Sequence, residues 1–354
     1  MDAGRYFGAG VPVYRQRMTA RRVFFASLVC GSILALVSAL TYVFAADGLR
    51  AIEIAMITVF ALNTPWMVIG FWNAVIGFSL LHFKRDWLQS VTGLAGLEDE
   101  TSAIGSRTSI IMPVHNESPD LVVGNLKAVT DSLDATGLSD TFDVFLLSDT
   151  TDPDIVQREQ ALFEAWRDGN ERPDRLHYRR RTDNSRQKVG NIEDFCTRWG
   201  DGFDFMIVLD ADSVMSGPAI LRLVRLMQHN PDLGILQTLV TGMPASSAFA
   251  RMFQFGMRHG MRSYTTGSAW WQGPDGPYWG HNAILRLEAF RRNCALPALP
   301  GTRPLGGEIL SHDQVEAVFM RRGGYEVRVL PLEEGSYEEN PTTLPDFLTR
   351  DLRW

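Results

Sequence analysis

Cysteine is scarce in this chain. The sequence has 3 cysteines among its 354 residues. Cys30, Cys196 and Cys294 are far apart, and no two of them have C-x-x-C spacing. The sequence therefore indicates neither a disulfide framework nor a zinc site, and a reducing compartment fits best.

Basic residues are also too few for a typical nucleic-acid-binding protein. Lysine and arginine number 34 against 41 aspartates and glutamates, and the net charge is -7. Domains that bind nucleic acids usually carry clustered Lys and Arg that neutralise phosphates. We therefore expect no nucleic-acid partner, although this charge does not exclude a nucleotide ligand. Internal repeats and low-complexity tracts are absent as well.

Charge is missing altogether from residues 23–46. A helix of about 20 apolar residues crosses the roughly 30 Å hydrocarbon core of a bilayer. A second apolar run, about 54–83, is long enough to span with tilt, and Pro65 is a candidate kink. We expect two transmembrane helices that form a hairpin over 23–83. Two buried core helices of a soluble protein are the alternative, which we disfavour because core helices rarely run so far without charge.

The basic residues around these runs predict an orientation. The arginines Arg15, Arg17, Arg21 and Arg22 precede the first run. Lys84 and Arg85 follow the second run, whereas only Arg50 lies between the two runs. Positive charge marks the cytoplasmic ends of transmembrane helices. We therefore expect residues 1–22 and everything after residue 84 to be cytoplasmic, with 84–107 as a polar linker.

From residue 108 onward, short apolar strands alternate with helical patterns. We predict parallel strands with helices between them at 108–113, 142–148, 176–179 and 203–209. Further strands of a mixed sheet are predicted at 235–241, 280–287 and 325–330, and a helix at 252–262. Such alternation is typical of an α/β domain, here 108–354, whose ligands bind at the carboxyl ends of the strands.

Acidic residues stand at those strand ends. Asp149 ends the second predicted strand, and Asp210 and Asp212 end the fourth. Two carboxylates on one turn suit a divalent cation such as Mg²⁺ that is bound partly through phosphate. Aspartate is also a common loop and N-cap residue, so this pair alone leaves both interpretations open.

Several short motifs together resemble the family 2 glycosyltransferases in order and spacing. They are Pro113-Val-His-Asn-Glu117, Asp149, Lys188-Val-Gly-Asn191, Asp210-Ala-Asp212, Ser311-His-Asp313 and Arg350-Asp-Leu-Arg-Trp354. The longer stretches KVGNIEDFCTRWG, MIVLDADSVMSG and YWGHNAILR look like the group that makes osmoregulated periplasmic glucans.

This resemblance implies a GT-A-type mixed sheet with flanking helices, preceded by two transmembrane helices. It further implies UDP-glucose as donor, Mg²⁺ or Mn²⁺ as cofactor, and a growing β-glucan as acceptor. The implied location is the inner membrane of a Gram-negative bacterium, which a multi-pass protein would span. Acyl carrier protein and a periplasmic glucan-processing protein are the implied partners. Glucose and its linkage rest on the resemblance alone.

The chain departs from the pattern at Arg350, where Gln is usual, and at Val189, where Ala is usual. It also stops at Trp354, where relatives continue into further helices, so we expect a glycosyltransferase domain that is incomplete at its C-terminus.

An inverting transfer needs a base and a cation on opposite faces of the sugar. By resemblance, Asp313 is the general base, although it could also be a helix N-cap. Asp210 and Asp212 would hold the metal against the diphosphate. The donor-binding residues would be Glu117, Asp149, Lys188, Gly190 and Asp210.

The acceptor would lie against Trp279, His281, Arg353 and Trp354, by the same resemblance. Two features receive plainer interpretations. We expect the arginines at 179, 180, 181 and 186 to form a solvated face, and His312 to be a surface residue.

Three other functions fit parts of the sequence. Met206 to Val214 also fits the signature of a haloacid-dehalogenase-type phosphohydrolase, with Asp210 as nucleophile and Asp212 as acid/base. That family has the motif on its first strand, whereas here it follows the fourth. A cellulose, chitin or hyaluronan type synthase would be expected to have Gln at position 350. A membrane-tethered nucleotide-sugar-binding module without transfer activity would not need Asp313.

Overall fold

The computed structural model describes residues 11–301, 306–309 and 311–351. The chain divides into two compact units. The first consists of Met1–Gly93 with His259–Gly273, and the second of Leu94–Arg258 with Pro274–Trp354. The long helix α8 (Ala248–Gln272) therefore begins in the second unit and ends in the first.

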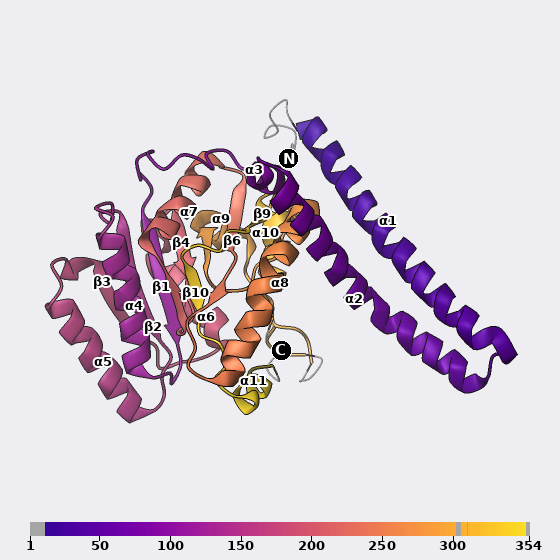
Figure 1. Ribbon diagram of the computed structural model, residues 1–354. Helices are drawn as coiled ribbons and strands as arrows, with labels where there is room; N and C mark the ends of the chain where they lie inside the picture. The colour runs from indigo at the N-terminus through magenta and orange to yellow at the C-terminus, as the bar shows by residue number, and fades with distance from the viewer. Residues whose placement is uncertain (1–10, 302–305, 310, 352–354) are drawn as a thin grey trace. The chain divides into compact units, whose positions relative to one another are not determined.

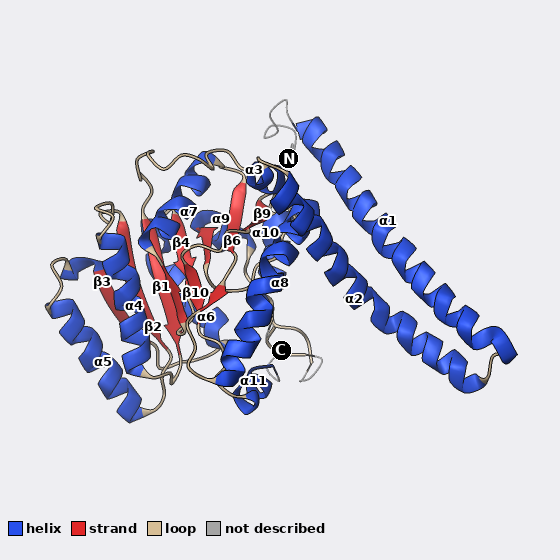
Figure 2. Cartoon of the chain, in the orientation of Figure 1, coloured by secondary structure: helices blue, strands red, loops and turns tan. Residues whose placement is uncertain are grey.

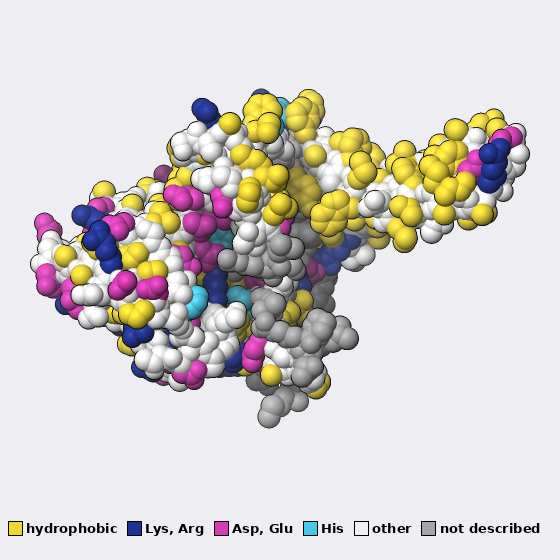
Figure 3. Space-filling model, turned by 90° about the horizontal axis from the view of Figure 1, so that it is seen from below, with side chains coloured by type: hydrophobic (Ala, Val, Ile, Leu, Met, Phe, Trp, Pro, Cys, Tyr) yellow, Lys and Arg dark blue, Asp and Glu magenta, His cyan; other side chains and the backbone are white. Residues whose placement is uncertain are grey.

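The first unit is built on a helical hairpin. Helix α1 (Val11–Phe44) and helix α2 (Ala51–Phe83) are joined by the short helix η1 (Ala45–Asp47), and α3 (Trp87–Thr92) follows. The spans Met18–Asp47 and Ala51–Phe83 are long and apolar enough to cross a membrane, by length and composition. Hydrophobic side chains cover the hairpin (Figure 3). Helix α3 lies inside the segment 84–107, which therefore contains a helix as well as extended chain.

The end of α8 packs on this hairpin within the first unit. The Trp271 ring stacks on Phe25 with centroids 4.5 Å apart, and its Nε1 donates to Asn73 Oδ1 at 2.9 Å. Arg22 donates to the carbonyl of Gln272 at 2.8 Å, which satisfies an acceptor at the helix end. These contacts join residues about 200 to 250 positions apart, so the part of α8 from residue 259 to its end at Gln272 is an integral part of the first unit.

The second unit is centred on a seven-stranded sheet with the order β3-β2-β1-β4-β8-β6-β9 (Figures 1 and 2). Its strands are β1 (Thr108–Val114), β2 (Phe142–Ser148), β3 (Leu176–Arg180), β4 (Phe205–Val208), β6 (Leu233–Thr238), β8 (Ala283–Arg286) and β9 (Glu326–Leu330). The first four in sequence are parallel, and β8 is antiparallel to both of its neighbours. The predicted mixed sheet is confirmed.

A smaller sheet has three strands in the spatial order β5-β10-β7. Its strands are β5 (Ser213–Met215), β10 (Ser336–Glu338) and β7 (Thr241–Gly242). The strand predicted at 235–241 therefore ends at Thr238, and its last residue begins β7 in the other sheet. Three residues or fewer are too short for a periodic pattern, which is why the sequence did not predict β5 or β10.

Helices cover both faces of the main sheet (Figure 2). They are α4 (Pro119–Asp134), α5 (Pro153–Asp168), α6 (Gln187–Trp199), α7 (Gly217–His229), α9 (Leu287–Asn293) and α10 (His312–Arg322), with the 3₁₀ turns η2 (Pro173–Arg175) and η3 (Gly200–Gly202). Helix α11 (Leu344–Asp351) packs instead on the start of α8, where the ring centroids of Phe347 and Phe253 lie 5.5 Å apart. The start of α5 is typical: Asp152 accepts hydrogen bonds from the amides of Asp154 and Ile155, and Pro153 occupies the first turn. The predicted helix 252–262 lies inside the longer α8.

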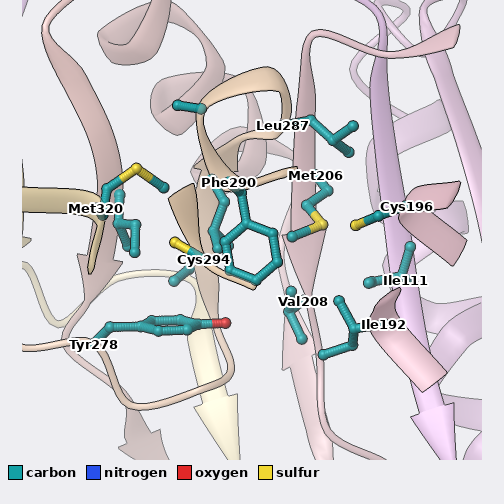
Figure 4. Packing of buried hydrophobic residues seen from close by; sticks show 14 of the residues in the cluster. Ile111, Ile192, Cys196, Met206, Val208, Tyr278, Leu287, Phe290, Cys294 and Met320 are labelled. Atoms are coloured by element: carbon teal, nitrogen blue, oxygen red, sulfur yellow. The ribbon is translucent and has the colours of Figure 1, made fainter. Parts of the chain in front are cut away.

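Side chains from α6, α9 and α10 form the core beneath one face of the sheet. Figure 4 shows the ring of Phe290 between Met206 and Cys294 in the middle of this cluster. Burial raises the pKa of the Cys196 thiol to about 12, so the thiol stays protonated and behaves as an apolar group. The core fixes α6 and α10, whose N-terminal residues include Lys188 and Asp313.

Candidate functional site

The predicted acidic residues meet at one edge of the sheet. Asp149 follows β2, and Asp210 and Asp212 follow β4. Strands β2 and β4 both lie parallel to β1, on either side of it. Parallel strands have their carboxyl ends at the same edge, so the topology brings together carboxylates that are about 60 positions apart in sequence.

Lys188 connects three parts of this edge. Its Nζ forms an ion pair with Asp210 and donates a hydrogen bond to the carbonyl of Gly280 at 3.1 Å. Burial raises the pKa of Asp210, but Lys188 and His281 lower it by more, so the pKa lies below its usual value. Asp210 is therefore an anion at neutral pH, held by a lysine that also touches the turn around Gly280.

Asp212 has the opposite electrostatic environment. Burial, followed by the nearby carboxylates of Glu338 and Asp210, raises the pKa of Asp212 to about 7. Glu338 is in β10, directly opposite Ser213 of β5, and the Glu339 amide donates to the Asp212 carbonyl at 3.1 Å. No sequence pattern indicated Glu338, because its position depends on pairing between two very short strands. A cation would relieve this crowding of negative charge.

The described residues do not by themselves complete a metal site at this place. Among the described residues, no group of three or more His, Cys, Asp or Glu side chains could hold a metal ion. Asp210 and Asp212 alone offer carboxylate oxygens on one turn. Mg²⁺ is commonly bound by one or two carboxylates together with substrate phosphates, and this donor set suits such a mode.

Asp313 lies beside the same turn. It is in the first turn of α10, its side chain is 7% exposed, and its Oδ1 accepts from the Gln314 amide at 2.9 Å. A Cβ atom built on Gly280 would lie 3.5 Å from the Asp313 Cβ and 3.8 Å from the Lys188 Nζ. Asp313, Lys188 and Asp210 therefore converge around Gly280, which needs its left-handed φ of +81° and has no side chain to fill the space.

A buried polar network holds the turn of residues 279–282. Gln237 accepts from the Trp279 amide at 2.9 Å and donates to the His281 carbonyl at 3.0 Å. Asn282, at φ +49°, donates to Ser336 Oγ at 2.9 Å. Gln237 and Asn282 are fully buried. The network leaves Trp279 and His281 partly exposed, and sequence patterns had given no signal for Gln237.

The prediction of a solvated arginine face is wrong for Arg179 and Arg181. Their side chains are 8% and 9% exposed. Arg181 donates to both carboxylate oxygens of Asp149, from Nε at 2.8 Å and from a terminal nitrogen at 2.6 Å. Arg179 lies 3.3 Å from Asp194 and 4.0 Å from Asp149. A buried carboxylate needs a paired cation, and only the fold revealed that the end of β3 and the residue after it supply it.

Two other predicted positions have close neighbours. Glu117 accepts a hydrogen bond from the His115 amide within its own loop. At Gly190, a Cβ would lie 2.2 Å from the Ser185 carbonyl oxygen. The absence of a side chain at this glycine therefore allows the backbone of the preceding turn to approach α6, whereas Gly190 was predicted as a donor-binding residue.

His312 is buried, so its prediction as a surface residue is wrong. It is 8% exposed, and its Nδ1 lies 3.1 Å from a carboxylate oxygen of Glu316, one helical turn away. The structure describes only part of the motif Arg350-Asp-Leu-Arg-Trp354, which includes two of the predicted acceptor residues. The backbone of Arg350 belongs to α11, and Arg353 and Trp354 lie outside the described residues.

The chain also matches a known protein family. Residues 205–354 match the model described as glycosyl transferase family group 2, a range that starts at β4 and includes Asp210, Asp212 and Asp313. Residues 205–354 therefore match a family 2 glycosyltransferase domain. The mixed sheet with its flanking helices is the architecture that the resemblance implied for a GT-A-type domain.

Similar proteins extend this match toward the N-terminus. The glucans biosynthesis glucosyltransferase H of Bradyrhizobium diazoefficiens is 44% identical over 308 residues, which cover 87% of this chain and 40% of that protein. The protein of the same name from Xanthomonas euvesicatoria pv. vesicatoria is 41% identical over 308 residues, 87% of this chain and 47% of that protein. The chain thus spans less than half of the length of these relatives.

Solved structures include similar folds at low identity. The mannosyltransferase PcManGT from Pyrobaculum calidifontis, in complex with GDP-Man and Mn²⁺, has a TM-score of 0.49 at 15% identity, covering 80% of this chain and 71% of that chain. TarS 1–349 of S. aureus in complex with UDP-GlcNAc has a TM-score of 0.44 at 14% identity, covering 68% and 60%.

Proposed function

We propose that this chain is the glycosyltransferase part of an inverting, membrane-bound glucosyltransferase. It would transfer glucose from UDP-glucose to a growing β-glucan, the backbone of an osmoregulated periplasmic glucan. The convergence of Asp313, Lys188 and Asp210 around Gly280 supports this proposal most strongly. Asp313 provides a carboxylate for base catalysis, and the ion pair of Asp210 with Lys188 provides charged groups on the donor side. An inverting transfer needs both a base and stabilisation of the leaving group's charge.

Asp313 is the proposed general base. It would accept the proton of the acceptor hydroxyl as that oxygen attacks the anomeric carbon from the face opposite UDP. Its burial and its hydrogen bond from the Gln314 amide fix the carboxylate without using a charged partner among the described contacts. The second oxygen is therefore available to receive a proton.

Asp212 and Asp210 are the proposed ligands of Mg²⁺ or Mn²⁺. The raised pKa of Asp212, about 7, reflects burial and carboxylate crowding that a divalent cation would relieve. Such a cation supplies charge neutralisation on the departing diphosphate. Lys188, already paired with Asp210, would add positive charge on the same side.

The remaining predicted residues would bind the two substrates. Asp149 and Glu117 would face the uridine of the donor, with Gly190 shaping the adjacent turn. Trp279 and His281 would contact the glucan, because the buried Gln237 and Asn282 hold them at the partly exposed turn next to Asp313. Arg353 and Trp354 remain proposed acceptor contacts on the resemblance alone.

The location and partners also belong to the proposal. Two apolar helices and their basic flanks support a transmembrane hairpin with a cytoplasmic glycosyltransferase domain in a Gram-negative inner membrane. Acyl carrier protein and a periplasmic glucan-processing protein are proposed partners from the resemblance. The phosphohydrolase alternative loses support, since the matched domain and relatives are glycosyltransferases.

Calorimetric titration of the full chain in detergent tests the donor site. We expect UDP-glucose to bind in the presence of Mg²⁺, and Asp212→Asn to abolish the metal-dependent part of binding because a ligand and a negative charge are lost. Asp131→Asn, at an exposed position on α4, is the matched control and should bind as wild type does. Equal metal dependence in all three proteins would overturn the assignment of Asp212.

A further inference from the structure

Arg186 binds groups from two separate segments of the second unit. It precedes α6 as its N-cap residue, two positions before Lys188. One guanidinium nitrogen pairs with Glu193 on α6, a second donates to the Leu296 carbonyl at 2.7 Å, and Nε donates to Glu308 at 3.2 Å. A single side chain therefore joins the Lys188 helix to the segment between α9 and α10.

That segment precedes the proposed base in the sequence. The backbones of Leu299 and Gly307 exchange two hydrogen bonds, of 2.9 and 3.0 Å, so the chain doubles back on itself. Arg186 binds Leu296 on the incoming arm and Glu308 on the outgoing arm. Glu308 is five positions before Asp313, since 313 minus 308 is 5. We call residues 296–301 and 306–308 the crossing arms.

The turn that presents Arg186 has a costly conformation. Arg186 and Gln187 have φ values of +61° and +49°, a region that residues with a Cβ rarely occupy. The Ser185 carbonyl sits where a Cβ of Gly190 would be, at 2.2 Å, so the turn is pressed against α6. Strain of this kind persists where surrounding contacts hold it, and it clusters at functional sites.

We propose that Arg186 is a positioning residue that sets the distance between the donor side of the site, at Lys188 and Asp210, and the base Asp313. This inference rests on the proposed function. Arg186 touches neither Lys188 Nζ nor Asp313, and acts through α6 and the crossing arms. Small misplacements of a reacting group lower the rate strongly, whereas they change donor affinity little.

The partial solvent exposure of Arg186 separates this role from a merely structural one. The side chains of Arg186 and Glu308 are 26% and 41% exposed. Ion pairs with this much solvent access contribute little to folding stability. Loss of Arg186 should therefore lower turnover much more than it lowers the unfolding temperature.

Steady-state glucosyl transfer by the full chain tests the proposal. For Arg186→Gln we expect kcat to fall at least about tenfold, with the donor KM within about twofold of wild type and an unfolding midpoint close to wild type. Arg186→Lys should recover only part of the loss, because one ammonium cannot reach three acceptors that lie in different directions. Glu308→Gln should show a smaller fall in kcat.

The matched control is Arg292→Gln, which breaks an exposed ion pair with Glu288 on α9 and should leave kcat unchanged. A kcat of Arg186→Gln equal to that of the control, or a loss of activity that follows a matching loss of stability, would overturn the inference.

Amide hydrogen exchange tests it even where transfer is absent. Arg186→Gln, but not Arg292→Gln, should speed exchange in peptides that contain Leu299 and Gly307. An inactive wild-type protein would refute the proposed function alone. Unchanged exchange in Arg186→Gln would refute the role of Arg186, whatever the activity.

Discussion

The carboxylate of Asp313 is oriented by the chain itself. Its side chain is 7% exposed, and one oxygen is held by the amide of the next residue. We predict that Asp313→Asn lowers kcat by about 10²- to 10⁴-fold, because an amide cannot take up the proton of the attacking glucan hydroxyl. Binding of UDP-glucose, measured by calorimetry, should be unchanged. Normal turnover in this variant would remove Asp313 as the base.

A second residue-scale prediction concerns the buried guanidinium of Arg175. Its side chain is 3% exposed and pairs with Asp134, which is 37% exposed. Burial raises the pKa of Asp134, but the hydrogen bonds from Arg175 and Ser139 lower it by more. We expect Asp134→Asn to lower the free energy of unfolding at pH 7 by about 1–2 kcal/mol, the lower part of the range for hydrogen bonds to charged groups, because solvent screens this pair.

The sign of the pH dependence follows from that lowered pKa. A carboxylate with a lower pKa in the folded state stabilises the protein above its unfolded pKa of about 3.9, and this contribution is lost as the pH falls through the folded pKa. The difference between wild type and Asp134→Asn should be full at pH 7 and shrink below about pH 4. Denaturant unfolding at several pH values measures it, and a difference that does not change with pH contradicts the assignment.

At the scale of elements, helices α2 and α8 touch through two glycines of the first unit. A Cβ on Gly77 would lie 1.8 Å from the Ser263 carbonyl oxygen, and one on Gly267 would lie 1.9 Å from that of Asn73. We predict that Gly77→Ala lowers stability by about 1–3 kcal/mol, because the helix backbones must move apart. The thermal unfolding midpoint in detergent measures this effect.

Gly70 provides the control on the same helix. A Cβ there would meet nothing within 4 Å, so Gly70→Ala should be neutral or slightly stabilising, given the higher helix propensity of alanine. Equal midpoints for the two variants would mean that α2 and α8 do not pack through Gly77.

At the scale of the whole molecule, the basic flanks of the hairpin predict its orientation. The loop at Arg50 should face the periplasm, and Glu100 the cytoplasm. We expect a membrane-impermeant maleimide to label Arg50→Cys in intact spheroplasts, and to label Glu100→Cys only after lysis. The reverse pattern would show that the hairpin is inverted.

Much of the fold could be predicted from local patterns. The strands ending at Asp149 and Asp210 are short apolar runs, and the helices between them have apolar residues at helical spacing, so burial alone indicates their type. Boundaries were less accurate, since the strand predicted at 203–209 extends from Phe205 to Val208. The two helices of the hairpin could also be predicted from the sequence, because a long apolar run without charged residues by itself indicates a helix that can span a membrane.

The sequence by itself determined the candidate site residues: the carboxylates at the strand ends, Lys188 at a helix start, and Asp313 in a short motif. The tertiary structure alone decided their partners. Arg181 pairs with Asp149, Glu338 approaches Asp212, and Arg186 reaches Glu308, in each case from another element. The physical reason is that charge pairing and burial depend on distance in space, which strand order and helix packing set, whereas local patterns report only on each segment's own exposure.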